Sequence, residues 1–128
     1  MIIGVLTFVS KKKYLASGTK QIIKEAKARG HKVKMLYSPY VGLEFGNGRT
    51  LSYKGKNLKP ESIDVVLVRP GFSTEPSIHA SVIKQFSVAG FNVVNDYIGV
   101  FRAKNKIRTL QILDHAGIAV PKTLVVKD

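Results

Sequence analysis

The chain of 128 residues contains no cysteine. Disulfide bridges, thiolate metal sites and cysteine nucleophiles are therefore excluded together. Its histidines follow no metal-ligand spacing and are expected at the surface; they are His31, His79 and His115. The phosphate-binding patterns GxxxxGK(S/T) and GxGxxG are also missing, so neither common phosphate-cradling loop is present. The residues alone assign no catalytic group and no metal ligand.

Acidic residues are scarce as well, with 8 Asp and Glu against 21 Lys and Arg, for a net charge of +13. Acids so few and scattered predict no magnesium site. Up to Lys34, nine cations face the single anion Glu25. Such a field attracts polyanions: nucleic acid, nucleotide phosphates or an acidic protein segment. The alternative is a basic surface that only keeps the protein in solution.

No apolar run approaches the length needed to cross a bilayer. Met1 leads directly into "IIGVLTFV" without a basic leader or cleavage site. We therefore expect a cytoplasmic protein with no membrane partner. The apolar content of 45% is enough for one domain with a real core.

The apolar residues that are present alternate between strand and helix patterns. Helices are expected from about Ser17 to a glycine stop at Gly30, and from near Pro76 to Gly90. The second helix is expected to bury four side chains, Ile78, Val82, Phe86 and Ala89. Strands are expected at Ile2–Val9, His31–Tyr37, Ile63–Arg69 and Phe91–Asn95. This alternation predicts an α/β fold, an open, mostly parallel, Rossmann-like sheet with helices on both faces.

A small β-hairpin excursion is expected within the segment Gly42–Leu58. It carries two turn patterns, Asn47-Gly48 and Lys54-Gly55, between short alternating runs.

Polar side chains follow two of the expected strands, at the carboxyl edge where open α/β sheets bind ligands. Arg69 ends an apolar strand, and either contacts a ligand, reaches solvent, or pairs with an acid such as Glu75. Asn95 ends the next strand. Its side chain either makes a second ligand contact or caps the following helix.

The stretch "FRAKNKIRTLQILDHAGIAVPKTLVV" (Phe101–Val126) reads as a basic helix, a glycine stop, a proline and a strand. On a helical wheel Lys106 falls on the apolar arc formed by Ala103, Ile107, Leu110 and Leu113. A lysine on a core-facing stripe is costly unless its ammonium finds an anion or reaches an edge, so a phosphate partner competes here with simple snorkelling. We expect Lys106 to bring its ammonium to the strand ends, with Lys104 and Arg108 more exposed.

The residues from "VVLVRPGFS" through "HASVIKQFSVAGFNVVNDYIGVFRAKNKIRTLQILDHAGIAVPKTLVV" resemble the N-terminal, pre-ATP-grasp part of RimK-like ATP-grasp ligases. That family joins a carboxylate to an amine through an acyl phosphate made from ATP; its namesake adds glutamate to a ribosomal protein. The resemblance implies a pre-ATP-grasp domain over 1–100. It also implies a helix and connector strand over 101–128, leading toward an ATP-grasp half supplied in cis or in trans.

The resemblance implies roles for three residues, Lys106, Arg69 and Asn95. Lys106 matches the family lysine that approaches an ATP phosphate, while the family aspartate before it is Asn105 here. Arg69, with Asn95, is expected at the acidic substrate or protein tail. The resemblance implies that ATP and magnesium are the cofactors of the complete parent enzyme. We expect this chain alone to bind neither of them tightly and to be non-catalytic.

A runner-up function is a basic module that binds nucleic acid or the ribosome, or one that docks an acidic tail. The aromatic residues are not interleaved with cations on a recognisable sheet face, so any nucleic-acid binding should be weak and non-specific.

Overall fold

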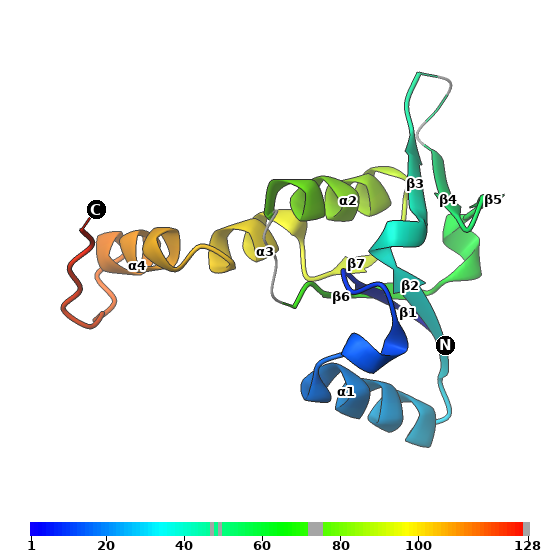
Figure 1. The fold of residues 1–128 in the computed structure, drawn as a ribbon, viewed down its shortest axis with the longest axis horizontal. Coiled ribbons are helices and arrows are strands. Elements are labelled where there is room, and N and C mark those ends of the chain that lie inside the picture. Colours follow the sequence, from blue (N-terminus) through cyan, green and yellow to red (C-terminus); the bar gives the residue numbers. More distant parts are fainter. Residues whose placement is uncertain (47, 49, 72–75, 127–128) are drawn as a thin grey trace.

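Two β-sheets organise the computed structural model of the chain, which describes residues 1–46, 48, 50–71 and 76–126 (Figure 1). The larger sheet has the strand order β2-β1-β6-β7, and each pair of adjacent strands in it is parallel. Its strands are β1 (Ile2–Thr7), β2 (Lys32–Tyr37), β6 (Val65–Arg69) and β7 (Val93–Val94). The predicted parallel α/β sheet is therefore confirmed, with β2 and β7 at its edges.

Helices cover both faces of this sheet. In Figure 1, α1 (Ser17–Ala28) and α2 (Pro76–Val88) lie on opposite sides of it. The side of α1 is packed by a small apolar cluster around Ile3 and Val5. The other side holds the main core, in which Leu6 and Phe86 are fully buried. Short 3-10 turns lie at Lys12–Tyr14 (η1), Ser38–Tyr40 (η2) and Pro60–Ser62 (η3).

The expected hairpin excursion is a separate antiparallel sheet, in the order β3-β4-β5. Its strands are β3 (Val41–Glu44), β4 (Thr50–Tyr53) and β5 (Lys56–Asn57). The turn between β4 and β5 has positive φ at Lys54 (52°) and Gly55 (74°), the geometry of tight hairpins. The other turn pattern includes Asn47, which lies outside the described residues. Leu51 and Leu58 are buried in the main core, so the excursion is packed on the larger sheet.

Helix α2 buries a stripe close to the expected one. Val82 and Phe86 are buried and Ala89 is half-buried, as predicted. The prediction for Ile78 was wrong, since this side chain is 55% exposed. The buried stripe is centred on Ile83 and Phe86, and Ile78 lies in the first turn, beyond its end.

The basic stretch near the C-terminus forms two helices where we expected one: α3 (Tyr97–Ala103) and α4 (Lys106–His115). Asn105 separates them as the N-cap of α4, its side-chain oxygen accepting a hydrogen bond from the Arg108 amide at 2.9 Å. Asn competes with backbone hydrogen bonding, and this favours a helix start over continuation. Ala103 and Leu110 therefore do not share one helix, and the wheel that placed Lys106 among them was wrong.

Helix α4 extends away from both sheets (Figure 1), and none of its residues is buried. Residues 118–126 have no regular secondary structure, although a strand was expected after Pro121. A strand needs a neighbour to hydrogen-bond with, and no described strand lies beside this segment. Of the helices in the described ranges, none has the length and apolarity to cross a membrane.

Candidate functional site

The carboxyl ends of the parallel strands lie at one edge of the larger sheet, where Thr7, the last residue of β1, pairs with Arg69, the last residue of β6. Arg69 is half-buried there, and its Nε donates to Oγ1 of Thr19 at 3.4 Å. Thr19 is buried in the first turns of α1, and a Cβ built on neighbouring Gly18 would lie 3.5 Å from an Arg69 Nη. The start of α1 thus holds one side of the guanidinium. A guanidinium has five N–H donors, so most of them are available for a ligand.

Each of these residues had an alternative role to ligand contact, an ion pair for Arg69 and a helix cap for Asn95. Glu75, the suggested acid partner of Arg69, lies outside the described residues. Asn95 is not the cap of the next helix, because Asp96 is: its carboxylate accepts from the Ile98 amide at 3.2 Å.

Arg69 and Asn95 line one pocket of about 440 Å³ between the ends of β6 and β7 and helix α3. Its remaining lining comes from the strand end and the helix: Val68, Pro70, Gly99, Val100, Ala103 and Lys104. The structure therefore brings together the two residues that the sequence analysis expected at an acidic substrate.

Lys104 is the lining residue that sequence reasoning missed. It is the C-cap of α3, and its Nζ donates to the backbone carbonyl of Gly71, just beyond β6. The single-helix wheel placed Lys104 away from the apolar arc, so the sequence analysis gave it no role. The break at Asn105 is the local feature that could have revealed it.

Lys106 does not line this pocket. It is the first residue of α4 and is exposed. Arg108 is less exposed than Lys106, because its guanidinium lies over the ring of Phe101 at 4.5 Å. The expectation that both neighbours would be more exposed than Lys106 was wrong, while its role toward phosphate stays a prediction.

The pocket suits an anion. It presents a guanidinium, an ammonium and a side-chain amide, and neither Arg69 nor Lys104 forms an ion pair with a described residue. Arg binds carboxylates through paired, charge-assisted hydrogen bonds, and a nearby Lys adds a second positive charge. Within the described ranges, no group of three or more His, Asp or Glu could hold a metal ion. His79 instead stacks on Phe8, with ring centroids 3.7 Å apart. The pocket of Arg69, Asn95 and Lys104 thus has the chemical groups needed to bind and orient an acidic group.

Comparison with known proteins identifies relatives over most of the chain. The family described as the RimK PreATP-grasp domain matches residues 1–100. A probable alpha-L-glutamate ligase from Pseudoalteromonas translucida is 35% identical over 124 residues, 96% of this chain and 39% of the relative. Another, from Maridesulfovibrio salexigens, is 34% identical over 126 residues, again 96% and 39%. The chain thus spans about two fifths of the length of these relatives.

Solved structures share the fold. The RimK domain ATP-grasp protein from Sphaerobacter thermophilus superposes with a TM-score of 0.60 at 19% identity, covering 93% of this chain and 40% of that one. The macrocyclase MdnC from Microcystis aeruginosa, solved with its precursor peptide MdnA, gives a TM-score of 0.58 at 17% identity, covering 97% and 46%. At these identities the likeness is one of architecture.

Proposed function

Since this chain belongs to the RimK PreATP-grasp domain family, we propose that it is the N-terminal part of an ATP-dependent carboxylate–amine ligase. The reaction joins an amino acid such as glutamate to a protein or peptide through an acyl phosphate. The names of the relatives, probable alpha-L-glutamate ligases, support the ligase class. The peptide-bound macrocyclase supports a peptide as the second substrate.

One observation carries this proposal: Arg69, Asn95 and Lys104 line a single pocket at the carboxyl edge of the sheet. The acidic substrate places its carboxylate there, held by Arg69 and oriented by the Asn95 amide. Lys104 adds positive charge to the wall of the pocket that helix α3 and its C-cap form. These groups act by positioning and electrostatic attraction, which in an enclosed cleft are worth more than in water.

ATP supplies the phosphoryl group that activates the carboxylate, and magnesium supplies positive charge at the phosphates. Lys106 suits a contact with an ATP phosphate, because its side chain is exposed at the start of α4 and can reach a nucleotide bound by an ATP-grasp half. The described part of the chain does not fit magnesium, because no described acids gather into a metal-binding group. The metal would be held by an ATP-grasp half, in cis or in trans, toward which residues 101–128 lead.

The test is ADP release on addition of ATP, magnesium and glutamate. The isolated chain should release none above background, because it does not hold the metal. A chimera that joins the chain to the remaining part of the Pseudoalteromonas translucida relative should release ADP in a glutamate-dependent way. Glutamate-dependent release by the isolated chain, abolished by a chelator, would contradict the proposal.

Variants of the chimera identify the residues. Arg69→Gln should lower kcat/KM about tenfold to a hundredfold, the effect of removing one charged hydrogen bond. Arg29→Gln removes the same charge outside the pocket and should change it little. Lys106→Met should lower turnover about tenfold to a thousandfold if its ammonium contacts phosphate, whereas Lys104→Met should act on the KM for glutamate. Equal, negligible effects of Arg69→Gln and Arg29→Gln would contradict the assignment of the pocket.

A further inference from the structure

Strand β2 leaves one edge of the larger sheet open. The Lys32 amide donates to the carbonyl of Met1 at 2.9 Å, so alternate residues of β2, starting at Lys32, direct their backbone groups to β1. Val33 and Met35 therefore direct their N–H and C=O groups away from the sheet. In the part of the chain that the structure describes, no other backbone or side chain bonds to these groups.

The carboxyl end of this edge is closed by a tyrosine. The amide of Tyr37, next in the outward series, donates to the phenol oxygen of Tyr53 at 3.4 Å. Burial, and then the electrostatic effect of Tyr53, raises the pKa of the Tyr37 phenol, which is uncharged at neutral pH. The open segment is thus short and lies between Lys32 and Tyr37.

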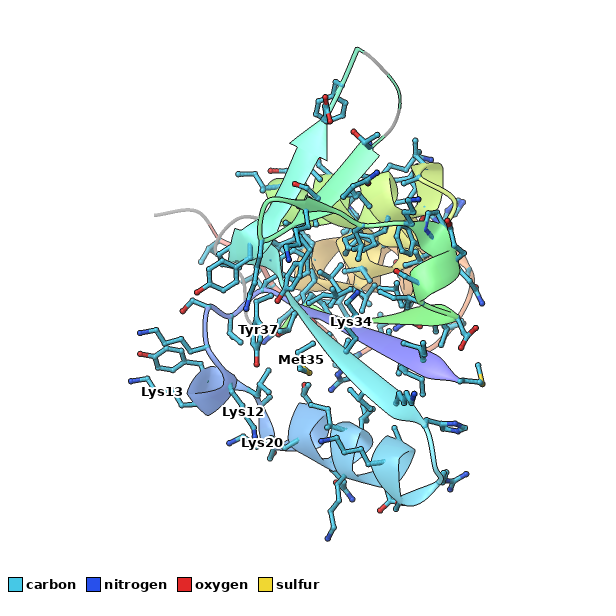
Figure 2. All side chains as sticks on the ribbon, turned by 90° about the vertical axis from the view of Figure 1, so that its right-hand side faces the viewer. Lys12, Lys13, Lys20, Lys34, Met35 and Tyr37 are labelled. Atoms are coloured by element: carbon cyan, nitrogen blue, oxygen red, sulfur yellow. The ribbon has the colours of Figure 1, made fainter. Side chains whose placement is uncertain are left out.

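Lysines flank the open edge on both faces. Figure 2 shows Met35 and Tyr37 pointing toward η1 and α1, where the first set of lysines lies. Lys34 points to the other face and shares a pocket of about 380 Å³ with Tyr53 and two hairpin lysines. We call these sets the α1-side lysines, Lys12, Lys13 and Lys20, and the hairpin-side lysines, Lys34, Lys54 and Lys56.

None of these six lysines forms an ion pair with an acidic side chain among the described residues. Lysines on an edge strand are a known defence against pairing with other sheets. That defence works against neutral or basic strands, because a lysine must lose its water to approach them. Against an acidic strand the same lysines are attractive, so they select the partner.

We propose that the open edge of β2 is a docking site for an extended acidic segment of a partner protein. The segment adds as a strand beside Val33 and Met35, and its alternating carboxylates reach the α1-side lysines on one face and the hairpin-side lysines on the other. Backbone hydrogen bonds give such a complex affinity, and alternate side chains give it specificity. This site is separate from the pocket of Arg69 and does not depend on the ligase proposal.

Two other occupants fit the edge less well. A nucleic acid has no peptide backbone to match the open N–H and C=O groups, and it relies on aromatic faces for stacking. Here lysines cover such faces: Lys13 lies over Tyr14 at 4.9 Å, and Lys54 over Tyr53 at 5.8 Å. A second copy of the chain is repelled by the net charge of +13 on each.

The test measures binding of a fluorescein-labelled oligoglutamate peptide to the full chain at physiological salt. The matched control is the same peptide with every second amide N-methylated, which keeps the charge but cannot pair as a strand. We expect the unmodified peptide to bind more tightly and to slow amide hydrogen exchange at Val33 and Met35. Equal binding of the two peptides, or tighter binding of a single-stranded RNA of equal charge, would overturn the proposal.

Charge variants locate the site. Replacing the three hairpin-side lysines by glutamine should weaken peptide binding roughly threefold to a hundredfold, the sum of three surface ion pairs. The α1-side triple should act similarly. A control triple, Lys84→Gln, Arg102→Gln and Lys122→Gln, removes the same charge from α2, α3 and the connector and should act less, because salt screens distant charges. Equal weakening by all three triples would mean attraction to net charge alone and would overturn the site.

Discussion

The four-stranded sheet and helix α4 carry the same kinds of apolar side chain but bury them very differently. In the sheet and the helices on it, Leu6, Ile83 and Phe86 are fully buried. In α4, Ile107 and Ile112 are 47% and 41% exposed, and Leu124 beyond it is 86% exposed. Apolar pattern alone therefore does not create a core. A second layer must be present to cover it, and the sheet has its layers while α4 has none in the described structure.

The largest effect should come from the core side of this comparison. Phe86→Ala removes a fully buried ring that packs edge-on against Phe91 at 5.2 Å between centroids. The free energy of unfolding should fall by about 3–5 kcal/mol, measured by urea denaturation. Ile78→Ala on the same helix is the matched control and should change it by less than about 0.5 kcal/mol. Similar losses for both would mean that α2 does not pack as described.

An intermediate effect is expected at the junction between the two regions. Asn105→Ala removes the N-cap of α4 and should destabilise that helix by about 0.5–2 kcal/mol. Because α4 buries no side chain, the loss should appear as faster hydrogen exchange of the Arg108 amide, with the global unfolding midpoint unchanged. Asp96→Ala is the control, since it uncaps α3, which contributes buried Val100, and should lower the midpoint. A global loss in Asn105→Ala would show that α4 belongs to the core.

The smallest effect should come from the exposed region. Ile112→Ala in this chain should change the free energy of unfolding by no more than about 0.5 kcal/mol, because no layer covers the side chain. In the chimera with an ATP-grasp half, the same change should cost about 2–5 kcal/mol if that half covers α4. Thermal and urea unfolding of both proteins make the comparison. An unchanged cost in the chimera would mean that α4 stays uncovered there.

The strand ends were the part of the site that could be predicted from sequence. Arg69 and Asn95 each follow an apolar run, and in a parallel sheet all carboxyl ends lie at one edge, so their proximity follows from topology. The role of Lys104 could not be predicted in this way. It depends on a helix break at Asn105. Asn is a favoured N-cap residue and so signals a possible break, but helix propensities that differ by fractions of a kcal/mol do not fix where the break falls.

The expected strand after Pro121 failed for a different reason. The apolar run Leu124–Val126 has strand propensity, but a strand forms only beside another strand. No described strand pairs with this run, so its strand propensity is not realised in this structure. Local sequence thus predicted the strands that pair within the larger sheet, and wrongly predicted one that has no partner among the described residues.

The joint at Asn105 also has a consequence for protein engineering. Of the residues that the structure describes, the last buried apolar side chain is Val100, five positions before the joint. Whatever follows Lys104 can therefore be exchanged as a cassette without opening the core. Different C-terminal modules could be grafted there while the anion pocket, whose wall ends at Lys104, is carried over intact.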